Sequence, residues 1–230
     1  MKKVVLASML VMFVSSAFAA DTAVLKVTGV LTNSSCTPEI SGGGVVDYGT
    51  IHLSALNTTA INQLGQKDFS LSITCPALTK AGFSVSDDRT GTAPNIMVKD
   101  GAGNGNDIIQ PLNMFGLNKT AGNVNIGNYT IFVKNDTITA DGATVGAIYS
   151  ADNGTSWSDN GTSWSDNGTL MVNDGSQIVS VATVGSTAPV AFKNLVIPMA
   201  VSAAIQDTNT LAITDDTNMD GQATFTIKYL

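Results

Sequence analysis

Alternation of apolar and polar residues at every second position is the feature that most restricts the fold of this chain. It is clearest in FSLSITC, residues 69–75, and it returns in ATFTIKY, residues 223–229. A period of two directs neighbouring side chains to opposite faces, so both runs predict half-buried β-strands. The second run reaches the final residues of the sequence. We therefore expect it to be held by a partner on its apolar face and along at least one backbone edge.

The rest of the sequence has the punctuation of an all-β protein. Clusters of Gly, Asn, Asp and Thr separate short runs that are rich in β-forming residues. No stretch predicts a long helix, although residues 55–64 are compatible with a short helical turn. Many short strands and frequent turns favour a sandwich of two sheets. Further strands are expected at residues 24–31, 45–51, 83–86, 129–134, 145–149, 177–184 and 195–205.

Residues 1–19 have the composition of a secretory signal peptide. Lys2 and Lys3 precede an apolar run over residues 4–14, and Ala17-Phe18-Ala19 supplies the small residues that a signal peptidase recognises. A membrane-spanning helix needs about 20 apolar residues, so a membrane anchor is the weaker interpretation. We expect the chain to be exported.

The remaining residues, 20–230, are expected to fold as one acidic β-sandwich domain. The whole chain has a formal charge of -7, and loss of the two lysines of the signal peptide changes it to -9. An acidic surface disfavours nucleic acid and anionic membranes as partners.

Cys36 and Cys75 are the two cysteines of the sequence. An even number of cysteines in an exported chain favours a disulfide over a metal-binding pair or a free catalytic thiol. The alternation of residues 69–75 places Cys75 on the buried face, where a bond to the first strand would need it. Closing a loop of this length stabilises a fold by about 4 kcal/mol in the chain-entropy model.

Four blocks together carry a resemblance to a known family. They are TGVLTNSSCTPEI at 28–40, VDYGTIHLS at 46–54, FSLSITC at 69–75 and ATFTIKYL at 223–230, with tyrosine next to last. In this order and spacing the chain resembles the subunits of bacterial chaperone-usher fimbriae. The DYG and DDR stretches are similar to a fimbrial-like branch of that family.

The resemblance implies an immunoglobulin-like β-sandwich that lacks its last strand and carries long loop insertions. A periplasmic chaperone would lend the missing strand, and an outer-membrane usher would exchange it for the N-terminal segment of another subunit at the cell surface. The implied function is a structural or adhesive fimbrial subunit, with a host glycan as one further partner. The residues expected to line or flank the open groove are Ala223, Phe225, Ile227 and Tyr229.

The expected N-terminal segment is short for this family. Residues 20–28 precede Gly29, where the first strand of the fold should be under way, and polymerising subunits usually have a longer extension. Leu25 and Val27 are the candidate donor residues. Three roles therefore remain possible: a subunit at the tip of the fibre, a minor subunit, or a single unit that stays bound to its chaperone.

One heptad, DNGTSWS, occurs at 152–158 and again at 159–165. Asn-Gly favours tight turns, so the repeat predicts a lengthened hairpin tip. Residues 150–157 resemble the Asp-box of sialidases, which is a hairpin element without a catalytic role. Trp157 and Trp164 lie in this loop, where an aromatic face can stack on a sugar ring or pack under its own turn. A self-contained carbohydrate-binding protein is therefore the alternative function.

Enzyme activity, a cofactor and a metal ion are not expected. The single histidine, His52, has neither a free cysteine nor a G-x-S-x-G serine to act with, and it is expected to be a surface or packing residue. Residues 87–89, Asp-Asp-Arg, are expected to form a structural ion pair or turn. Residues 216–221 match the opening of a calcium loop, but Ile227 stands where such a loop needs a glutamate. The glycine-rich stretch 100–107 is expected to be a polar turn.

Overall fold

A computed structural model describes residues 26–27, 35–134, 137–159 and 169–230. Residues 33–230 form one compact unit, which contains all the helices and strands described. The predicted signal peptide, Leu25, Trp164 and most of the predicted strand at 24–31 lie outside the described residues.

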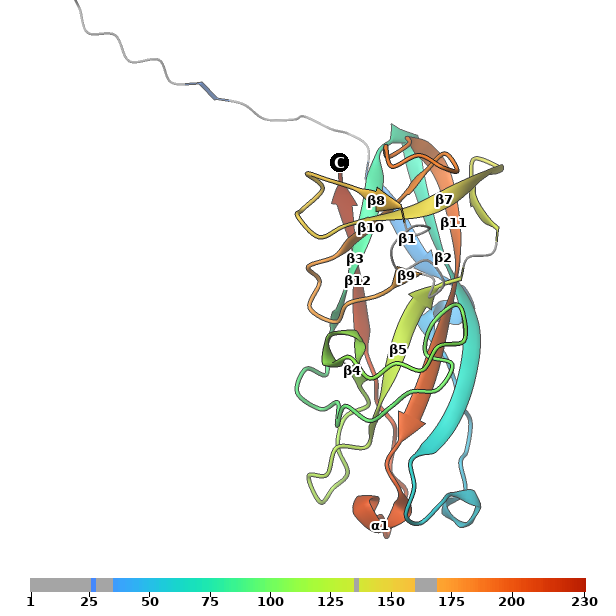
Figure 1. Ribbon diagram of the computed structural model, residues 1–230, viewed down its shortest axis with the longest axis vertical. Helices are drawn as coiled ribbons and strands as arrows, with labels where there is room; N and C mark the ends of the chain where they lie inside the picture. Colours follow the sequence, from blue (N-terminus) through green and yellow to red (C-terminus); the bar gives the residue numbers. More distant parts are fainter. Residues whose placement is uncertain (1–25, 28–34, 135–136, 160–168) are drawn as a thin grey trace, which may run out of the picture. The chain divides into compact units, whose positions relative to one another are not determined.

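The described residues are almost entirely β-structure (Figure 1). Apart from the helix α1 (Thr208–Leu211), helical residues occur only in the short turns η1 (Ser41–Gly44), η2 (Leu53–Ala55) and η3 (Pro111–Asn113). Within the part of the chain that the structure describes, no helix is long and apolar enough to cross a lipid bilayer. The strands are β1 (Thr37–Ile40), β2 (Asn62–Thr79), β3 (Ala81–Asp87), β4 (Phe115–Gly116), β5 (Gly127–Val133), β6 (Ile138–Ala140), β7 (Ala143–Ser150), β8 (Ser158–Asp159), β9 (Thr169–Leu170), β10 (Ile178–Ala182), β11 (Phe192–Ile205) and β12 (Ala223–Tyr229).

These strands form a nearly closed antiparallel sheet that folds over on itself as a sandwich. Its main path runs β1-β2-β11-β6-β7-β10-β3-β12, while β4 and β9 pair with β5, which itself pairs with β11. The connection between the layers is the pairing of β6 with β7. Phe69 of β2 contacts Phe225 of β12 edge-on at 6.3 Å between ring centroids, so the two ends of the path approach each other. The predicted sandwich is confirmed.

The core lies between the two layers and is built from the apolar face of each alternating strand. In β2, Leu71, Ile73 and Cys75 are buried, whereas the intervening residues are more exposed. This matches the period of two in the sequence. The largest fully buried side chains are Phe83, Phe115, Phe132, Phe192, Leu71, Ile73, Met114, Ile148, Met171, Leu195, Ile197 and Met199.

The predicted strand at 45–51 is wrong as a paired strand. β1 ends at Ile40, and three successive glycines, residues 42–44, follow with positive φ angles of 66°, 69° and 79°. This conformation favours glycine and is incompatible with a strand, so the chain turns away from β2 before residue 45. The helical turn considered at 55–64 is wrong, because η2 ends at Ala55, residues 56–61 are not helical and β2 begins at Asn62.

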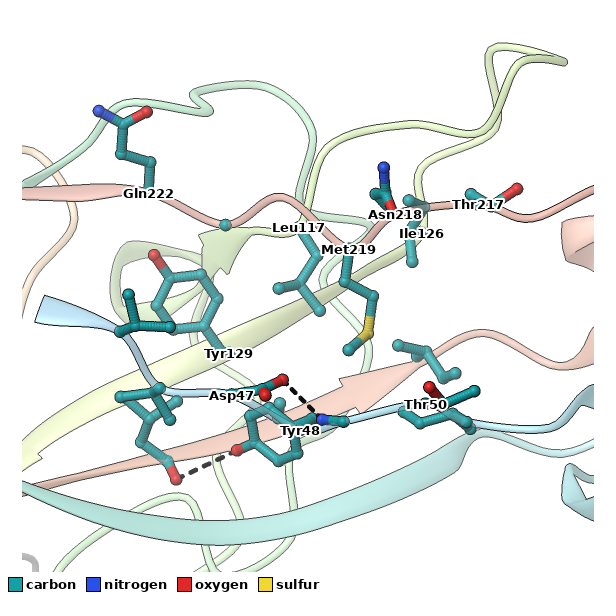
Figure 2. Close-up of a pocket in the computed structure, with 18 of the residues that line it drawn as sticks. Asp47, Tyr48, Thr50, Leu117, Ile126, Tyr129, Thr217, Asn218, Met219 and Gln222 are labelled. Carbon is teal, nitrogen blue, oxygen red and sulfur yellow. Dashed lines mark hydrogen bonds between the residues drawn. The ribbon is translucent and has the colours of Figure 1, made fainter. Parts of the chain in front are cut away.

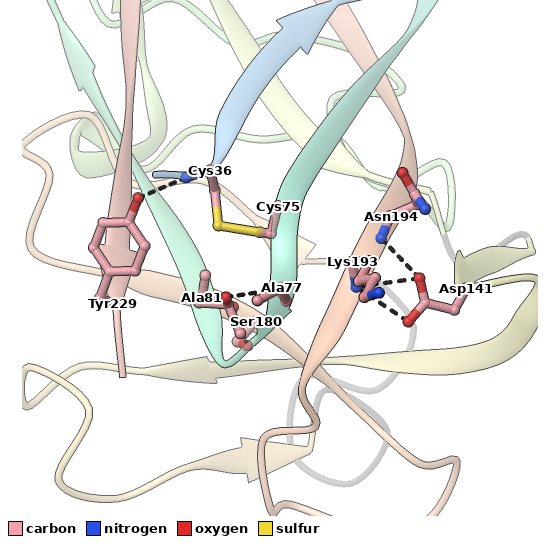
Figure 3. The surroundings of a disulfide bond; sticks show 10 residues. Cys36, Cys75, Ala77, Ala81, Asp141, Ser180, Lys193, Asn194 and Tyr229 are labelled. Atoms are coloured by element: carbon pink, nitrogen blue, oxygen red, sulfur yellow. Dashed lines mark hydrogen bonds between the residues drawn. A yellow bond between two sulfur atoms is a disulfide. The ribbon is translucent and has the colours of Figure 1, made fainter. Parts of the chain in front are cut away.

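Cys36 and Cys75 form the predicted disulfide (Figure 3). Thr37 of β1 pairs with Thr74 of β2, so the two cysteines stand opposite each other at the next position of the ladder. The bond therefore fixes β1 to β2 within one layer.

Candidate functional site

A groove of about 860 Å³ separates the two ends of the sheet path. One wall is β12 together with residues 213–222, and the other is the segment 44–53 that follows η1. Its floor consists of apolar side chains from β5, β11 and nearby loops, among them Leu117, Ile126 and Tyr129. Figure 2 shows Gln222 and Met219 on one wall and Asp47 and Tyr48 on the facing chain. We call this space the groove.

β12 offers an open backbone edge to the groove. Among the described strands it pairs with β3 alone. The bonds from the Asp88 amide to Gln222 and from the Leu230 amide to Lys80 bracket this ladder. Antiparallel bonds recur at every second residue, so the even-numbered residues of β12 pair with β3. The odd-numbered residues, 223, 225, 227 and 229, consequently direct their N–H and C=O groups away from β3.

The facing wall is also an edge. Residues 46–51 make no backbone–backbone hydrogen bond to any described residue. Val46, Tyr48 and Ile51 are half-buried, whereas the residues between them are exposed. This segment is thus held by one side-chain face, and its backbone is not paired with a described strand, although the Gly49 amide donates to the Asp47 carboxylate.

Tyr48 anchors this wall. Its hydroxyl donates to the carbonyl oxygens of Gly65 at 2.9 Å and Val201 at 3.4 Å. Lys67 lies over the ring, with Nζ 5.4 Å from the centroid. Burial raises the pKa of Tyr48 to about 12, so the phenol stays protonated and able to donate at neutral pH.

Beyond the residues that line the groove, a hydrogen bond joins the end of β12 to the residue that precedes β1, and we call this side of the groove its closed end. The backbone amide of Cys36 donates to the Tyr229 hydroxyl oxygen at 2.8 Å (Figure 3). Because the disulfide holds Cys36 to β2, this bond ties the end of β12 to the opposite layer.

The Asp-Asp-Arg stretch fixes the other end of β12. The buried carboxylate of Asp87 accepts the amides of Arg89 and Gly116, and burial raises its pKa more than these bonds lower it. Arg89 forms an ion pair with Asp220, which lowers the pKa of that carboxyl group. Asp88 accepts the hydroxyl of Thr224 at 2.8 Å. These residues have the predicted structural role.

The calcium-like motif at 216–221 has a structural explanation too. Asp220 is engaged by Arg89 and by the side-chain amide of Asn118. A Cβ atom at Gly221 would lie 2.7 Å from a ring carbon of Tyr129, so glycine is needed where the chain crosses that ring. Within the described residues, no group of three His, Cys, Asp or Glu side chains is placed to hold a metal ion.

The predicted groove residues divide into two pairs. Ala223 and Phe225 line the groove, and Phe225 also stacks on Phe83 at 5.9 Å between centroids. Ile227 packs on the core nearer the closed end, and Tyr229 is 50% exposed there. The opposite wall was not predicted as part of the site, although residues 45–51 were expected to form a strand.

The predicted donor residues are not placed in any element. Leu25 lies outside the described residues, and Val27 belongs to no helix or strand. His52 is exposed, and its carbonyl group accepts the amide of Ala55 in η2.

The first heptad forms a tight turn between β7 and β8, as expected for a hairpin tip. Asp152 accepts the Ser150 hydroxyl, and the Gly154 amide donates to the same hydroxyl oxygen. The Trp157 indole N–H donates to the carbonyl oxygen of Gly154 at 3.1 Å, and its ring lies close to this glycine. Trp157 therefore packs on its own turn, which is the second of the two roles considered for it.

Comparison with known proteins gives one matching family model and two relatives from one bacterium. Residues 25–130 match the sequence model of a family described as "Protein of unknown function (DUF1120)". The chain is 30% identical to "Uncharacterized protein YhcF" of Escherichia coli K12 over 227 residues, covering 95% of this chain and 94% of that protein. It is 29% identical to "Protein GltF" of the same bacterium over 230 residues, covering 90% and 87% of the two chains. By its match to this family model and its similarity to YhcF over nearly the full length of both chains, the protein belongs to the DUF1120 family.

Proposed function

We propose that this protein is a structural or adhesive subunit of a cell-surface fimbria, completed by a strand from another polypeptide. It would be exported to the periplasm, held there by a fimbrial chaperone, and assembled at an outer-membrane usher. The observation that carries the proposal is the groove, which combines an apolar floor with two facing backbone edges. The four sequence blocks that resemble fimbrial subunits support it.

Both walls of the groove have backbone groups that another strand could pair with. The odd-numbered residues of β12 and the facing residues 46–51 present N–H and C=O groups that lack backbone partners in the described chain. Such edges invite pairing with another strand, and the apolar floor between them adds a hydrophobic driving force. Strand addition satisfies the backbone on both sides and places alternate side chains on the floor, as in the known complexes of fimbrial chaperones with pilins.

Expression in the periplasm tests this function. Produced alone, the protein should aggregate or be degraded, because an open edge beside exposed apolar surface promotes association. Produced with a fimbrial chaperone from a panel, it should give a soluble one-to-one complex. The measurement is the soluble yield and the mass of the complex.

A pair of variants on the same strand sharpens the test. Phe225→Ser removes a groove-lining ring and should lower the yield of complex, since such a loss costs roughly 2 to 4 kcal/mol. Thr226→Ser, on the exposed face of β12, is the matched control and should leave the yield unchanged. If the wild-type protein produced alone in the periplasm gives as much soluble, intact monomer as it gives with every chaperone of the panel, the proposal is overturned.

A further inference from the structure

All the charged residues that line the groove are acidic. Asp47 lines one wall, and Asp215 and Asp216 line the other. Among the described residues that line the groove there is no lysine, arginine or histidine. The three side chains are on exposed residues, so they form a negatively charged rim above an apolar floor. We call the carboxylates of Asp47, Asp215 and Asp216 the rim.

No ion pair among the described residues involves a carboxylate of the rim. The two ion pairs in this part of the chain are Arg89–Asp220 and Lys134–Asp68. Asp47 accepts the amide of Gly49 at 2.7 Å, and Asp215 accepts the hydroxyl of Thr214 at 3.2 Å. These are local contacts with neutral groups, so the negative charge of the rim is available to an incoming chain.

Resting on the proposed function, we propose that the groove selects an extended apolar strand that carries a lysine or arginine on its outward face beside the rim. A strand between the two edges presents alternate side chains to the floor and to solvent. Apolar residues suit the floor, and the outward side chains stand near the rim. There a cation is attracted and a carboxylate is repelled, so charge sets the choice among apolar strands of similar shape.

The sequence contains a segment with this chemistry. In residues 24–31, VLKVTGVL, the alternate positions 25, 27, 29 and 31 are Leu, Val, Gly and Leu, and Lys26 is on the opposite side. The segment has no acidic residue. It therefore serves as the probe, and a second copy of this chain is a natural source of such a strand.

The test measures uptake of synthetic peptides by the chaperone-bound protein. Three peptides span residues 20–33: the natural sequence, Lys26→Gln and Lys26→Glu. At low salt the natural peptide should displace the chaperone with an apparent affinity about five- to tenfold higher than the Lys26→Glu peptide, with Lys26→Gln between them. The difference should shrink in about 0.5 M NaCl, because salt screens exposed charges.

Variants of the protein test whether the rim causes the difference in affinity between the peptides. Asp215→Asn with Asp216→Asn should reduce the difference between the peptides to less than about twofold. Asp216→Asn alone should reduce it in part, and Asp107→Asn, an equal change in charge at a residue that does not line the groove, should not.

The outcomes separate this inference from the proposed function. Uptake of all three peptides with equal affinity overturns the charge selection and leaves the strand-binding groove standing. Failure of every peptide and every chaperone to bind overturns both. Stoichiometric Ca²⁺ binding that depends on Asp215 and Asp216 and persists with the peptide bound also overturns the selection, because the rim would then be a cation site.

Discussion

The backbone amide of Cys36 donates a hydrogen bond to the phenolic oxygen of Tyr229 over 2.8 Å, and this bond joins the two ends of the sheet path. Its partners are 193 positions apart in the chain and meet at the closed end of the groove. The disulfide holds one partner and the β3 ladder holds the other. The bond consequently holds the end of β12 against the layer that contains β1 and β2.

Tyr229→Phe removes the acceptor and leaves the rest of the ring in place. The Cys36 amide is only partly buried, so water replaces some of the lost interaction and the free energy of unfolding should fall by about 1 kcal/mol. Urea unfolding of the refolded chain measures this change. Tyr149→Phe is the control, because the Tyr149 hydroxyl has no hydrogen-bond partner among the described residues. Equal effects in the two variants would contradict the role given to Tyr229.

The disulfide should contribute more to the free energy of unfolding than the hydrogen bond of Tyr229 does. Replacing Cys36 and Cys75 together by serine removes a cross-link between positions 39 residues apart, and unfolding should become easier by about 4 kcal/mol in the chain-entropy model. Thiol labelling of the unfolded, unreduced wild-type protein should detect no reactive thiol. Two labelled thiols per chain would show that the bond does not form in the exported protein.

Among the residues of the Asp-Asp-Arg stretch, which fixes the start of β12, Asp87 should contribute most to stability. Its two carboxylate oxygens accept one amide each, from Arg89 and Gly116. Asp87→Asn keeps the shape but offers one oxygen, so one amide loses its acceptor and stability should fall by about 1 to 3 kcal/mol. Asp88→Asn is the matched control, because its exposed oxygen accepts a hydroxyl that water can also satisfy. Comparable losses in thermal unfolding would argue against the buried role of Asp87.

Asp152 should keep its charge to unusually low pH. Bonds from the side chain and backbone of Ser156, and then from the Ser150 hydroxyl, lower the pKa of its carboxyl group from 3.8 to about 2. A lowered pKa in the fold means that these bonds contribute fully above about pH 4 and are lost as the pH falls toward about 2. NMR titration of the side-chain carboxyl carbon should give a midpoint near 2. A midpoint near the ordinary value of 3.8 would mean that the turn does not hold Asp152 in solution.

The long strands could be predicted from the sequence because half-buried strands repeat every two residues. This signal located β2 and β12, whereas runs of β-forming residues between turn clusters located β3, β5, β7, β10 and β11. The short strands β4, β6, β8 and β9 have two or three residues each, too few to show a period. Residues 45–51 have the β-forming composition of a strand, yet within the described chain their backbone pairs with no other strand, because pairing depends on which chain lies alongside and not on composition alone.

The candidate site was predictable on one side only. The alternation of ATFTIKY identified the groove face of β12, and the resemblance to fimbrial subunits supplied the idea of an open edge. The rim could not be foreseen, since only the fold makes Asp47 and Asp216 line the same groove. The sequence also could not say that Ile227 and Tyr229 lie toward the closed end, because that depends on where the disulfide holds β1.

Hydrogen exchange along β12 gives the most direct test of the open edge. In the refolded chain without a donated strand, the amides of residues 223, 225 and 227 face the groove and should exchange quickly. Those of residues 224, 226 and 228 bond to β3 and should be protected, so protection should alternate along the strand. Binding of a strand should slow the exchange of the odd-numbered amides by at least about tenfold and change that of the even-numbered ones much less.

The even-numbered amides are the internal control, because global unfolding would expose both sets equally. Odd-numbered amides already protected in the refolded monomer would show that the edge is closed by the chain itself, and the groove would then have no place for a second strand.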